Sequence, residues 1–296
     1  MASNTHHFIV GGHGLTITFA HDDSNNIGLL PSFEPFRADS IDNTLLSLTV
    51  DDTLQPAKEK TLIRAFDTGN GDTIVYMLPD GGYQYVIKNI DGKECCLLIT
   101  NRDFNQCKCA LKGNRNMRAF GLNDALMLAY AFAGSFHHTL LIHASTIGYK
   151  NRAYPFTAKS GTGKSTHAAL WMQNIEDCEL INDDNPILRF NPGQKLPTLY
   201  GSPWSGKTPC YRNISMTLGA ITQIERAKEN SIRQLPTIEA FATMLPMCST
   251  MKWDSRLNDN LCETLSKIIE TTPIYTLYCL PNAEAAQLSC NTIAKP

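Results

Sequence analysis

The chain contains the stretch Ala158-Lys159-Ser160-Gly161-Thr162-Gly163-Lys164-Ser165. It matches the phosphate-binding loop pattern except at Ala158, where glycine is usual. The two glycines permit backbone turns that a Cβ disfavours, so consecutive N–H groups can point toward a phosphate. Lys164 would place its ammonium against the terminal phosphates of a nucleotide, and the Ser165 hydroxyl would reach Mg²⁺. The stretch therefore predicts binding of ATP with Mg²⁺.

The flanking sequence fits the order of strand, loop and helix that such a loop requires. Before the loop, Ala153–Thr157 is short and apolar-aromatic and predicts a strand, in which Pro155 is tolerable near a sheet edge. After the loop, Thr166–Met172 has apolar residues at helical spacing. This helix would begin near Ser165 and direct its partly positive N-terminus at the same anion. The alternative is a glycine-rich turn that matches the motif by chance.

Length and composition limit the classes of protein to consider. The 296 residues fit one large domain or two ordinary ones, and a hydrophobic share of 43% is enough for a sizeable core. A net charge of −2 gives no basic footprint for nucleic acid or an anionic membrane. No secretory signal is recognisable, and the longest apolar run, Ala125–Ala133, is too short to span a bilayer. We therefore expect a soluble cytoplasmic protein without nucleic-acid or membrane partners.

The ten cysteines do not predict a disulfide framework. In a chain of this length without a signal peptide the thiols are expected to be reduced, and no Cys-x-x-Cys pair indicates a zinc ribbon. Cys107 and Cys109 would face the same side of a strand and could bind a soft metal. Reduced, half-buried strand cysteines are the preferred interpretation.

Residues 1–115 predict a β-rich antiparallel domain of strands separated by glycine- and asparagine-rich turns. In its later part the strand spacing favours an antiparallel meander. His6, His7, His13 and His21 fall on different faces or in loops, so surface histidines are preferred over a metal site. The role of this half is not evident from its residues. The expected strands are His7–Val10, Leu15–Phe19, Leu45–Val50, Leu62–Phe66, Thr73–Leu78, Tyr83–Lys88, Cys95–Ile99 and Cys107–Leu111.

The pattern changes after Gly113–Asn116, and residues 116–296 are expected to form an α/β domain. Asn123 is a plausible cap for a largely apolar helix over Asp124–Phe132 that Gly134 ends. Around the loop, further strands are expected over Leu140–Ser145, Gly219–Glu225 and Ile274–Cys279, and further helices over Thr237–Met244, Leu257–Ile269 and Asn282–Ile293.

Two adjacent carboxylates follow the predicted loop helix. Glu179–Asp184 is typical of a short apolar strand, and it ends in Asp183 and Asp184. A strand lying beside the loop would deliver these carboxylates to Mg²⁺ and to the attacking group. Since Asp, Asn and Pro are turn formers, the alternative is a solvated turn before Asn185-Pro186. The position one helix after the loop favours the functional interpretation.

The next distinctive segment is Tyr200–Lys207, a loop rich in glycine and proline that holds one aromatic residue and one lysine. It could close over a substrate. It could equally be a turn whose Trp204 is packed into the core, and the sequence leaves both interpretations open.

Taken together, residues 120–296 resemble the C-terminal kinase domain of HPr kinase/phosphorylase and the wider HPr-kinase-like group. That group shares its nucleotide-binding core with ATP-dependent phosphoenolpyruvate carboxykinase. Three motifs in order carry the resemblance: His143-Ala144-Ser145, the loop Ser160–Thr166, and Asp183-Asp184. Later stretches that are also similar to the group are 219–234, 239–245 and 274–286.

The resemblance implies a phosphotransferase that uses ATP and Mg²⁺. By it, Lys164 contacts the β- and γ-phosphates and Ser165 holds Mg²⁺. Asp183 and Asp184 would supply a metal contact and a base that deprotonates an acceptor hydroxyl, with their roles not yet divided. His143 would lie at the active site, and the alternative is a core histidine on an apolar strand. The residues that would bind the nucleotide are Ser160, Gly161, Thr162, Gly163, Lys164, Ser165 and Thr166.

The chain also departs from the family pattern. HPr kinase carries a Glu-Ile-Arg-Gly signature after the aspartate pair, with the glutamate near the metal, whereas the corresponding region here, Tyr200–Trp204, has no carboxylate. This weakens HPr as the substrate and the reverse phosphorolysis. Residues 1–115 do not resemble the N-terminal domain of HPr kinases, and the chain is too short for a complete phosphoenolpyruvate carboxykinase. The phosphate acceptor is therefore left open.

The sequence thus predicts an ATP- and Mg²⁺-dependent kinase that phosphorylates a hydroxyl on a protein or small molecule. One alternative is a phosphoenolpyruvate-carboxykinase-like or phosphorolytic enzyme. Another is a nucleotide-binding module without catalysis that uses ATP to regulate the β-rich half. The oligomeric state stays open, with a homo-oligomer among the options.

Overall fold

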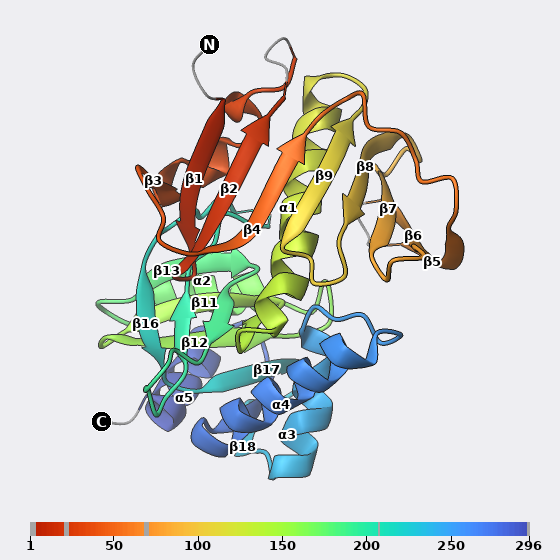
Figure 1. Ribbon diagram of the computed structural model, residues 1–296. Coiled ribbons are helices and arrows are strands. Elements are labelled where there is room, and N and C mark those ends of the chain that lie inside the picture. The colour runs from red at the N-terminus through yellow and green to blue at the C-terminus, as the bar shows by residue number, and fades with distance from the viewer. Residues whose placement is uncertain (1–3, 21–23, 68–70, 207, 295–296) are drawn as a thin grey trace. The chain divides into compact units, whose positions relative to one another are not determined.

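The computed structural model describes residues 4–20, 24–67, 71–206 and 208–294. The fold is mixed α/β, and the chain divides into two compact units, Met1–Gly134 and Ser135–Pro296, each built on one sheet (Figure 1). Among the described helices, none combines the length and the apolar character needed to cross a membrane.

The first unit contains all eight strands that the sequence predicts, together with a short ninth strand that it does not. Their bounds are β1 (Thr5–Val10), β2 (His13–Phe19), β3 (Arg37–Ala38), β4 (Thr44–Val50), β5 (Thr61–Asp67), β6 (Asp72–Met77), β7 (Tyr83–Lys88), β8 (Glu94–Thr100) and β9 (Gln106–Leu111). Two 3-10 helices, η1 (Ile27–Leu29) and η2 (Pro31–Phe36), follow β2. The sheet order is β3-β1-β2-β4-β9-β8-β7-β6-β5.

Strands β5 to β9 form the predicted antiparallel meander. The expectation of a wholly antiparallel half is wrong, however, because β4 pairs in parallel with both β2 and β9. A parallel pair needs a long crossover. Here the segment with η1 and η2 connects β2 to β4, and the meander itself connects β4 to β9. Local strand spacing carries no signal for such pairings.

The long helix α1 (Arg115–Ser135) extends beyond the prediction at both ends. Asn123 lies inside the helix, and Asn114 satisfies its first turn instead, since its Oδ1 accepts a hydrogen bond from the Met117 N–H at 3.1 Å. Gly134 is also helical and does not end it. The predicted cap and stop are therefore wrong, because the apolar run covered only the middle of the helix.

Helix α1 packs against the first sheet. A Cβ at Gly121 would lie 2.8 Å from the Cys95 backbone, so only glycine permits this approach to β8. The Tyr130 hydroxyl donates to the Val10 carbonyl at 3.0 Å. The boundary expected after residue 115 assigns this helix to the second domain, whereas the compact units place it in the first.

The cysteines and early histidines have plain structural roles. All ten cysteines are free thiols, as predicted, and Cys107 and Cys109 are both buried on β9. His13 is buried rather than on the surface, with its ring edge-on to Tyr130 at 6.2 Å. His21 lies outside the described residues.

The second unit has a ten-stranded sheet with two pairs of α-helices. The strands are β10 (Thr139–Leu141), β11 (Ala144–Tyr149), β12 (Arg152–Thr157), β13 (Glu179–Asp184), β14 (Ile187–Arg189), β15 (Thr198–Tyr200), β16 (Ser215–Leu218), β17 (Ile221–Arg226), β18 (Ser231–Gln234) and β19 (Ile274–Cys279). The helices are α2 (Lys164–Asn174), α3 (Thr237–Met244), η3 (Leu245–Met247), α4 (Ser255–Thr271) and α5 (Ala283–Ile293). The sequence misses β14, β15, β16 and β18, which are only three or four residues long.

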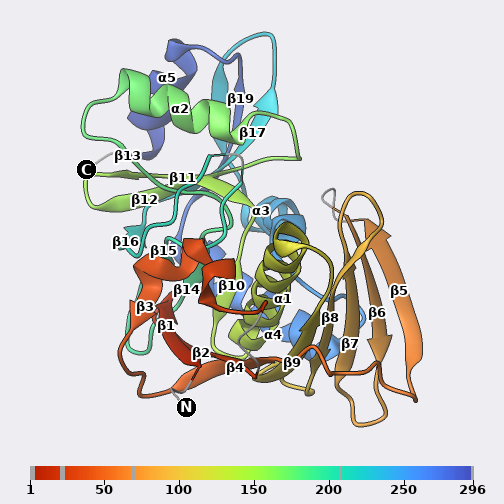
Figure 2. The ribbon, with the colours of Figure 1, turned by 90° about the horizontal axis from the view of Figure 1, so that it is seen from above.

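The main path of this sheet is β10-β14-β15-β16-β12-β17-β19-β18, and β11 pairs with β12 and β13. Helices α2 and α5 lie side by side and share one core with the sheet (Figure 2). Trp171 and Phe156 are fully buried there. Helices α3 and α4 bury their apolar residues in a second core. The loop that precedes α2 therefore follows the carboxyl end of β12, an inner strand of this sheet.

Two expectations about the strands before the loop need correction. Pro155 does not lie near an edge, because β12 pairs with β11 on one side and with β16 and β17 on the other. The ladder on the second side passes from β16 to β17 between Ala153 and Phe156, so it skips Pro155. The strand expected over 140–145 is interrupted at Ile142 and His143, which separate β10 from β11.

Candidate functional site

The segment between β12 and α2 has the predicted order of strand, loop and helix. Gly161 and Gly163 have φ of 75° and 134°, in the region that favours glycine. Helix α2 begins at Lys164, and no side chain caps its N-terminus. Its first N–H groups are therefore not occupied by a side-chain cap and are oriented out of the helix end, as an anion site requires.

The departure at Ala158 has a structural explanation. This residue is fully buried in the core that α2 and α5 share, and its backbone does not adopt a positive φ. No feature of the conformation demands glycine there, and the methyl group contributes to packing. The deviation from the motif is thus neutral for the loop geometry.

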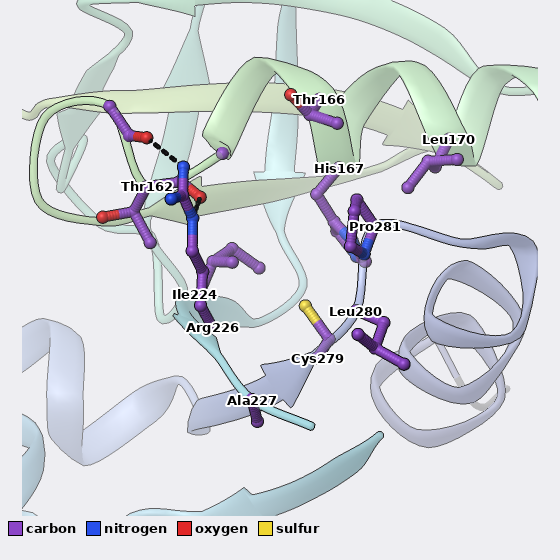
Figure 3. Close-up of a pocket in the computed structure, with 12 residues that line it drawn as sticks. Thr162, Thr166, His167, Leu170, Ile224, Arg226, Ala227, Cys279, Leu280 and Pro281 are labelled. Carbon is purple, nitrogen blue, oxygen red and sulfur yellow. Dashed lines mark hydrogen bonds between the residues drawn. The ribbon is translucent and has the colours of Figure 1, made fainter. Parts of the chain in front are cut away.

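Arg226, at the end of β17, is hydrogen-bonded to two carbonyls of the loop, a contact that the sequence did not predict. Its Nε donates to the Thr162 carbonyl at 3.0 Å, and its Nη2 donates to the Gly161 carbonyl at 2.6 Å (Figure 3). One guanidinium therefore bridges two successive carbonyls of the loop. No pattern in the sequence around Arg226 predicts this contact.

The loop lysine lies against the predicted histidine and aspartate. Lys164 Nζ is 2.7 Å from His143 Nε2, and His143 Nδ1 is 2.9 Å from Asp184 Oδ1. Because a carboxylate only accepts and an ammonium only donates, His143 carries its hydrogen on Nδ1 and accepts at Nε2. The side chain of His143 is 41% exposed, so the alternative of a core histidine is wrong.

The loop serine lies against the other aspartate. The Ser165 hydroxyl donates to Asp183 Oδ1 at 2.8 Å. Asp183 is only 3% exposed, so the alternative of a solvated turn is wrong as well. In the part of the chain that the structure describes, no cationic side chain forms an ion pair with Asp183. This buried carboxylate therefore has a hydroxyl as its side-chain partner.

The pKa values at the site follow from burial and from these contacts. Burial lowers the pKa of Lys164, and the negative charges of Asp184 and Asp183 offset only part of that effect. Burial alone would raise the pKa of Asp184. The hydrogen bonds from His143 and Asn185 and the positive charge of Lys164 outweigh burial, and the pKa of Asp184 is lowered.

Asp184 also has an unusual backbone. Its φ is 137°, a region that side-chain-bearing residues rarely adopt. The strain lies where β13 ends, and Asn185 Nδ2 donates to Asp184 Oδ2 at 2.9 Å. His143 lies in the break just before the neighbouring strand β11, and its backbone N–H donates to the Met247 carbonyl at 2.8 Å. His143 therefore projects from a break between two strands, and Asp184 is the last residue of a third.

Strand β13 is separated from β12 by β11, in which Ser145 is in register with Asp183 and Ala144 with Asp184. The aspartates thus reach the loop across one intervening strand rather than from a directly neighbouring one. The remaining predicted residues, Ser160 and Thr166, are exposed.

The loop after β15 is a packed turn. Trp204 is 2% exposed, and Asn182 Nδ2 donates to its carbonyl at 3.1 Å. Ser205 Oγ donates to the Asp183 carbonyl at 3.0 Å. The interpretation of Trp204 as a core anchor is therefore confirmed, and the loop supports the backbone of the aspartate pair. Lys207 lies outside the described residues.

The loop serine and the two aspartates beside it are oxygen donors, the ligand type that Mg²⁺ prefers. Within the described ranges, no three or more His, Cys, Asp or Glu side chains are gathered as a metal site. Mg²⁺ usually keeps several waters and takes one or two carboxylates together with substrate phosphates. Asp183, Asp184 and the Ser165 hydroxyl are of the right chemical type for that role.

Comparisons with known proteins do not assign the chain to a family. No family model matches the chain, and no curated protein matches it. Among solved structures, one described as the HPr(Ser) kinase/phosphatase from Coxiella burnetii superposes with a TM-score of 0.31 and 8% sequence identity, over 51% of this chain and 94% of that chain. This similarity is too low to establish a shared fold, so the family resemblance inferred from the sequence stays a prediction.

Proposed function

We propose that the second unit binds a nucleoside triphosphate with Mg²⁺ and transfers its terminal phosphoryl group to a hydroxyl. The observation that carries the proposal is the contact chain from Lys164 through His143 to Asp184, directly beside the phosphate loop. A loop that only bound phosphate would need Lys164, but it would not need Asp184 as a proton acceptor beside it. The candidate acceptors are a hydroxyl on a protein or on a small molecule.

From the contacts we assign different roles to the two aspartates. Asp183, with Ser165, would hold Mg²⁺, which would neutralise charge on the phosphates. Asp184, with His143, would receive the proton of the acceptor hydroxyl. As the acceptor oxygen bonds to phosphorus, the bridging P–O bond breaks and the diphosphate leaves. Lys164 would shift from His143 Nε2 to the phosphates and neutralise part of their charge, while the His143 Nδ1–H would keep Asp184 Oδ1 in place.

Transfer of label from γ-labelled ATP tests the proposal. With Mg²⁺ and a lysate of the source cells, the wild type should label a protein or a metabolite. Lys164→Ala should abolish this label because it removes a charge-assisted contact to phosphate. Asp184→Asn should keep nucleotide binding but slow transfer by roughly 10²–10⁴-fold, the usual contribution of a general base. Asp177→Asn, an exposed aspartate before β13, is the matched control.

Two outcomes would count against the proposal. Labelling that is equal in Asp184→Asn and wild type would remove the assigned base. ATP binding without any transfer to an acceptor or to water would favour the non-catalytic nucleotide-binding module.

A further inference from the structure

A hollow of about 460 Å³ lies beside the phosphate loop, within the second unit. Its walls are the loop, the first two turns of α2, and the ends of β17 and β19 (Figure 3). A volume of this size is in the range that holds small ligands. Its apolar lining consists of Leu170, Ile224, Ala227, Cys279, Leu280 and Pro281.

The hollow is continuous with the proposed phosphate site. Gly161, Thr162 and Gly163 belong to both, and Thr166 in the first turn of α2 lines the hollow as well. A ligand whose phosphates lie on the loop therefore has its remaining part directed into apolar space. A nucleoside base has two apolar ring faces and fits this description.

Most polar groups in the walls already have partners inside the protein. The Arg226 guanidinium is bound to the two loop carbonyls. The Leu280 N–H donates to Asn230 Oδ1 at 2.8 Å, and the Leu280 carbonyl accepts from Asn282 N–H at 3.0 Å. The Ala227 N–H donates to the Cys279 carbonyl at 3.2 Å. The Leu280 and Ala227 N–H groups are thus occupied by protein acceptors, and the Arg226 guanidinium is anchored to the loop.

The imidazole of His167, which also lines the hollow, has a hydrogen-bond partner inside the protein as well. Ser289 Oγ donates to the Ala286 carbonyl and accepts from Trp171 Nε1, so His167 Nε2 is the donor in its 3.1 Å contact with that oxygen. Burial lowers the pKa of His167 to about 4, so the ring is neutral at physiological pH. It adds an uncharged face to the hollow.

We infer that this hollow holds the base of the nucleoside triphosphate by packing, so that the site binds purine and pyrimidine triphosphates with similar affinity. The inference rests on the proposed function, because the phosphates must lie on the loop. Sites that hydrogen-bond a substrate group can reject analogues by orders of magnitude, whereas apolar pockets discriminate weakly. The triphosphate therefore determines recognition, and the base adds affinity with little selectivity.

Calorimetric titrations with ATP and with inorganic tripolyphosphate, both with excess Mg²⁺, test the inference. Leu170→Trp and Cys279→Met each fill the hollow from opposite walls. Met172→Trp is the matched control, since Met172 lies on the same helix, is 42% exposed and does not line the hollow. Thermal unfolding of each variant shows whether the fold is kept. A further series compares ATP, GTP, CTP and UTP on the wild type.

The expected result is at least a tenfold loss of ATP affinity in both filled variants, with tripolyphosphate affinity unchanged within twofold and no effect of Met172→Trp. The four triphosphates should bind within about tenfold of one another. Unchanged ATP affinity in both folded, filled variants would overturn the assignment of the hollow, as would equal losses for ATP and tripolyphosphate. A preference above a hundredfold for one base would overturn the inference that purine and pyrimidine triphosphates bind with similar affinity. If the wild type binds neither ligand, the proposed function itself fails, and this inference fails with it.

Discussion

The Ser165 hydroxyl donates a 2.8 Å hydrogen bond to Asp183 Oδ1 and so joins the first turn of α2 to the end of β13. Asp183 is 3% exposed, and such a carboxylate is costly to bury unless a cation or several donors satisfy it. This pair is the position that we propose for Mg²⁺, which gives the first prediction.

Asp183→Asn should weaken Mg²⁺ binding in the presence of nucleotide. Loss of an outer-shell partner of a metal ligand costs about 10–100-fold in affinity, and loss of a ligand should cost at least as much. The measurement is nucleotide affinity as a function of Mg²⁺ concentration. Asp184→Asn is the comparison, because it should alter transfer more than Mg²⁺ dependence. If the two variants had the same Mg²⁺ dependence, the division of roles between the aspartates would be wrong.

The second prediction concerns the backbone of Asp184, whose φ is 137°. Asp184→Gly and Asp184→Ala both remove the carboxylate, but only glycine relieves the conformation. The glycine variant should therefore have the higher free energy of unfolding, by about 1–3 kcal/mol. Urea denaturation of the two variants measures this difference. Phosphoryl transfer should be lost in both variants, because both lack the carboxylate. Equal free energies of unfolding would mean that the end of β13 relaxes and stores no strain.

The site could be predicted from the sequence where its chemistry is local. The loop motif contains its own glycines, lysine and serine, and the strand ending in Asp183 and Asp184 follows one helix later, so the candidate residues could be named from their order in the chain. His143 was placed at the site by family resemblance, and the structure brings it there. The roles of these residues stay predictions.

The parts that the sequence missed depend on long-range pairing. Arg226 reaches the loop only because β17 lies next to β12 in parallel, which no local pattern specifies. The parallel pairs of β4 have the same origin. Strands of three or four residues, such as β14 and β15, are too short to show an alternating pattern. The break at His143 interrupts an apolar run that reads as one strand.

The third prediction is that Arg226 acts as a positioning residue for the loop. Arg226→Ala removes both hydrogen bonds to the Gly161 and Thr162 carbonyls, so tripolyphosphate and ATP affinity should fall together, by about tenfold. Arg226→Lys should recover little, because an ammonium lacks the planar fork that bridges two carbonyls. Calorimetry with both ligands provides the measurement. A loss confined to ATP would instead place Arg226 on the base.

The fourth prediction follows from the buried ring of His167. Its pKa falls from 6.5 to about 4 because burial disfavours the charged form. Between these values the unfolded chain binds a proton that the folded chain does not, so the free energy of unfolding rises with pH across this window. The stability is fully present above pH 6.5 and is lost as the pH falls toward 4, by an amount on the order of 3 kcal/mol.

His167→Gln should flatten this dependence, since an amide can still donate to Ser289 Oγ but does not titrate. Urea denaturation of wild type and variant between pH 4.5 and about 7.5 measures the two slopes, over the interval in which the histidine of the unfolded chain changes charge. Met172→Gln, at an exposed position on the same helix without a titratable group, is the control and should keep the wild-type slope. A slope that persists in His167→Gln would show that other groups carry the acid sensitivity and that the ring is not held neutral by burial.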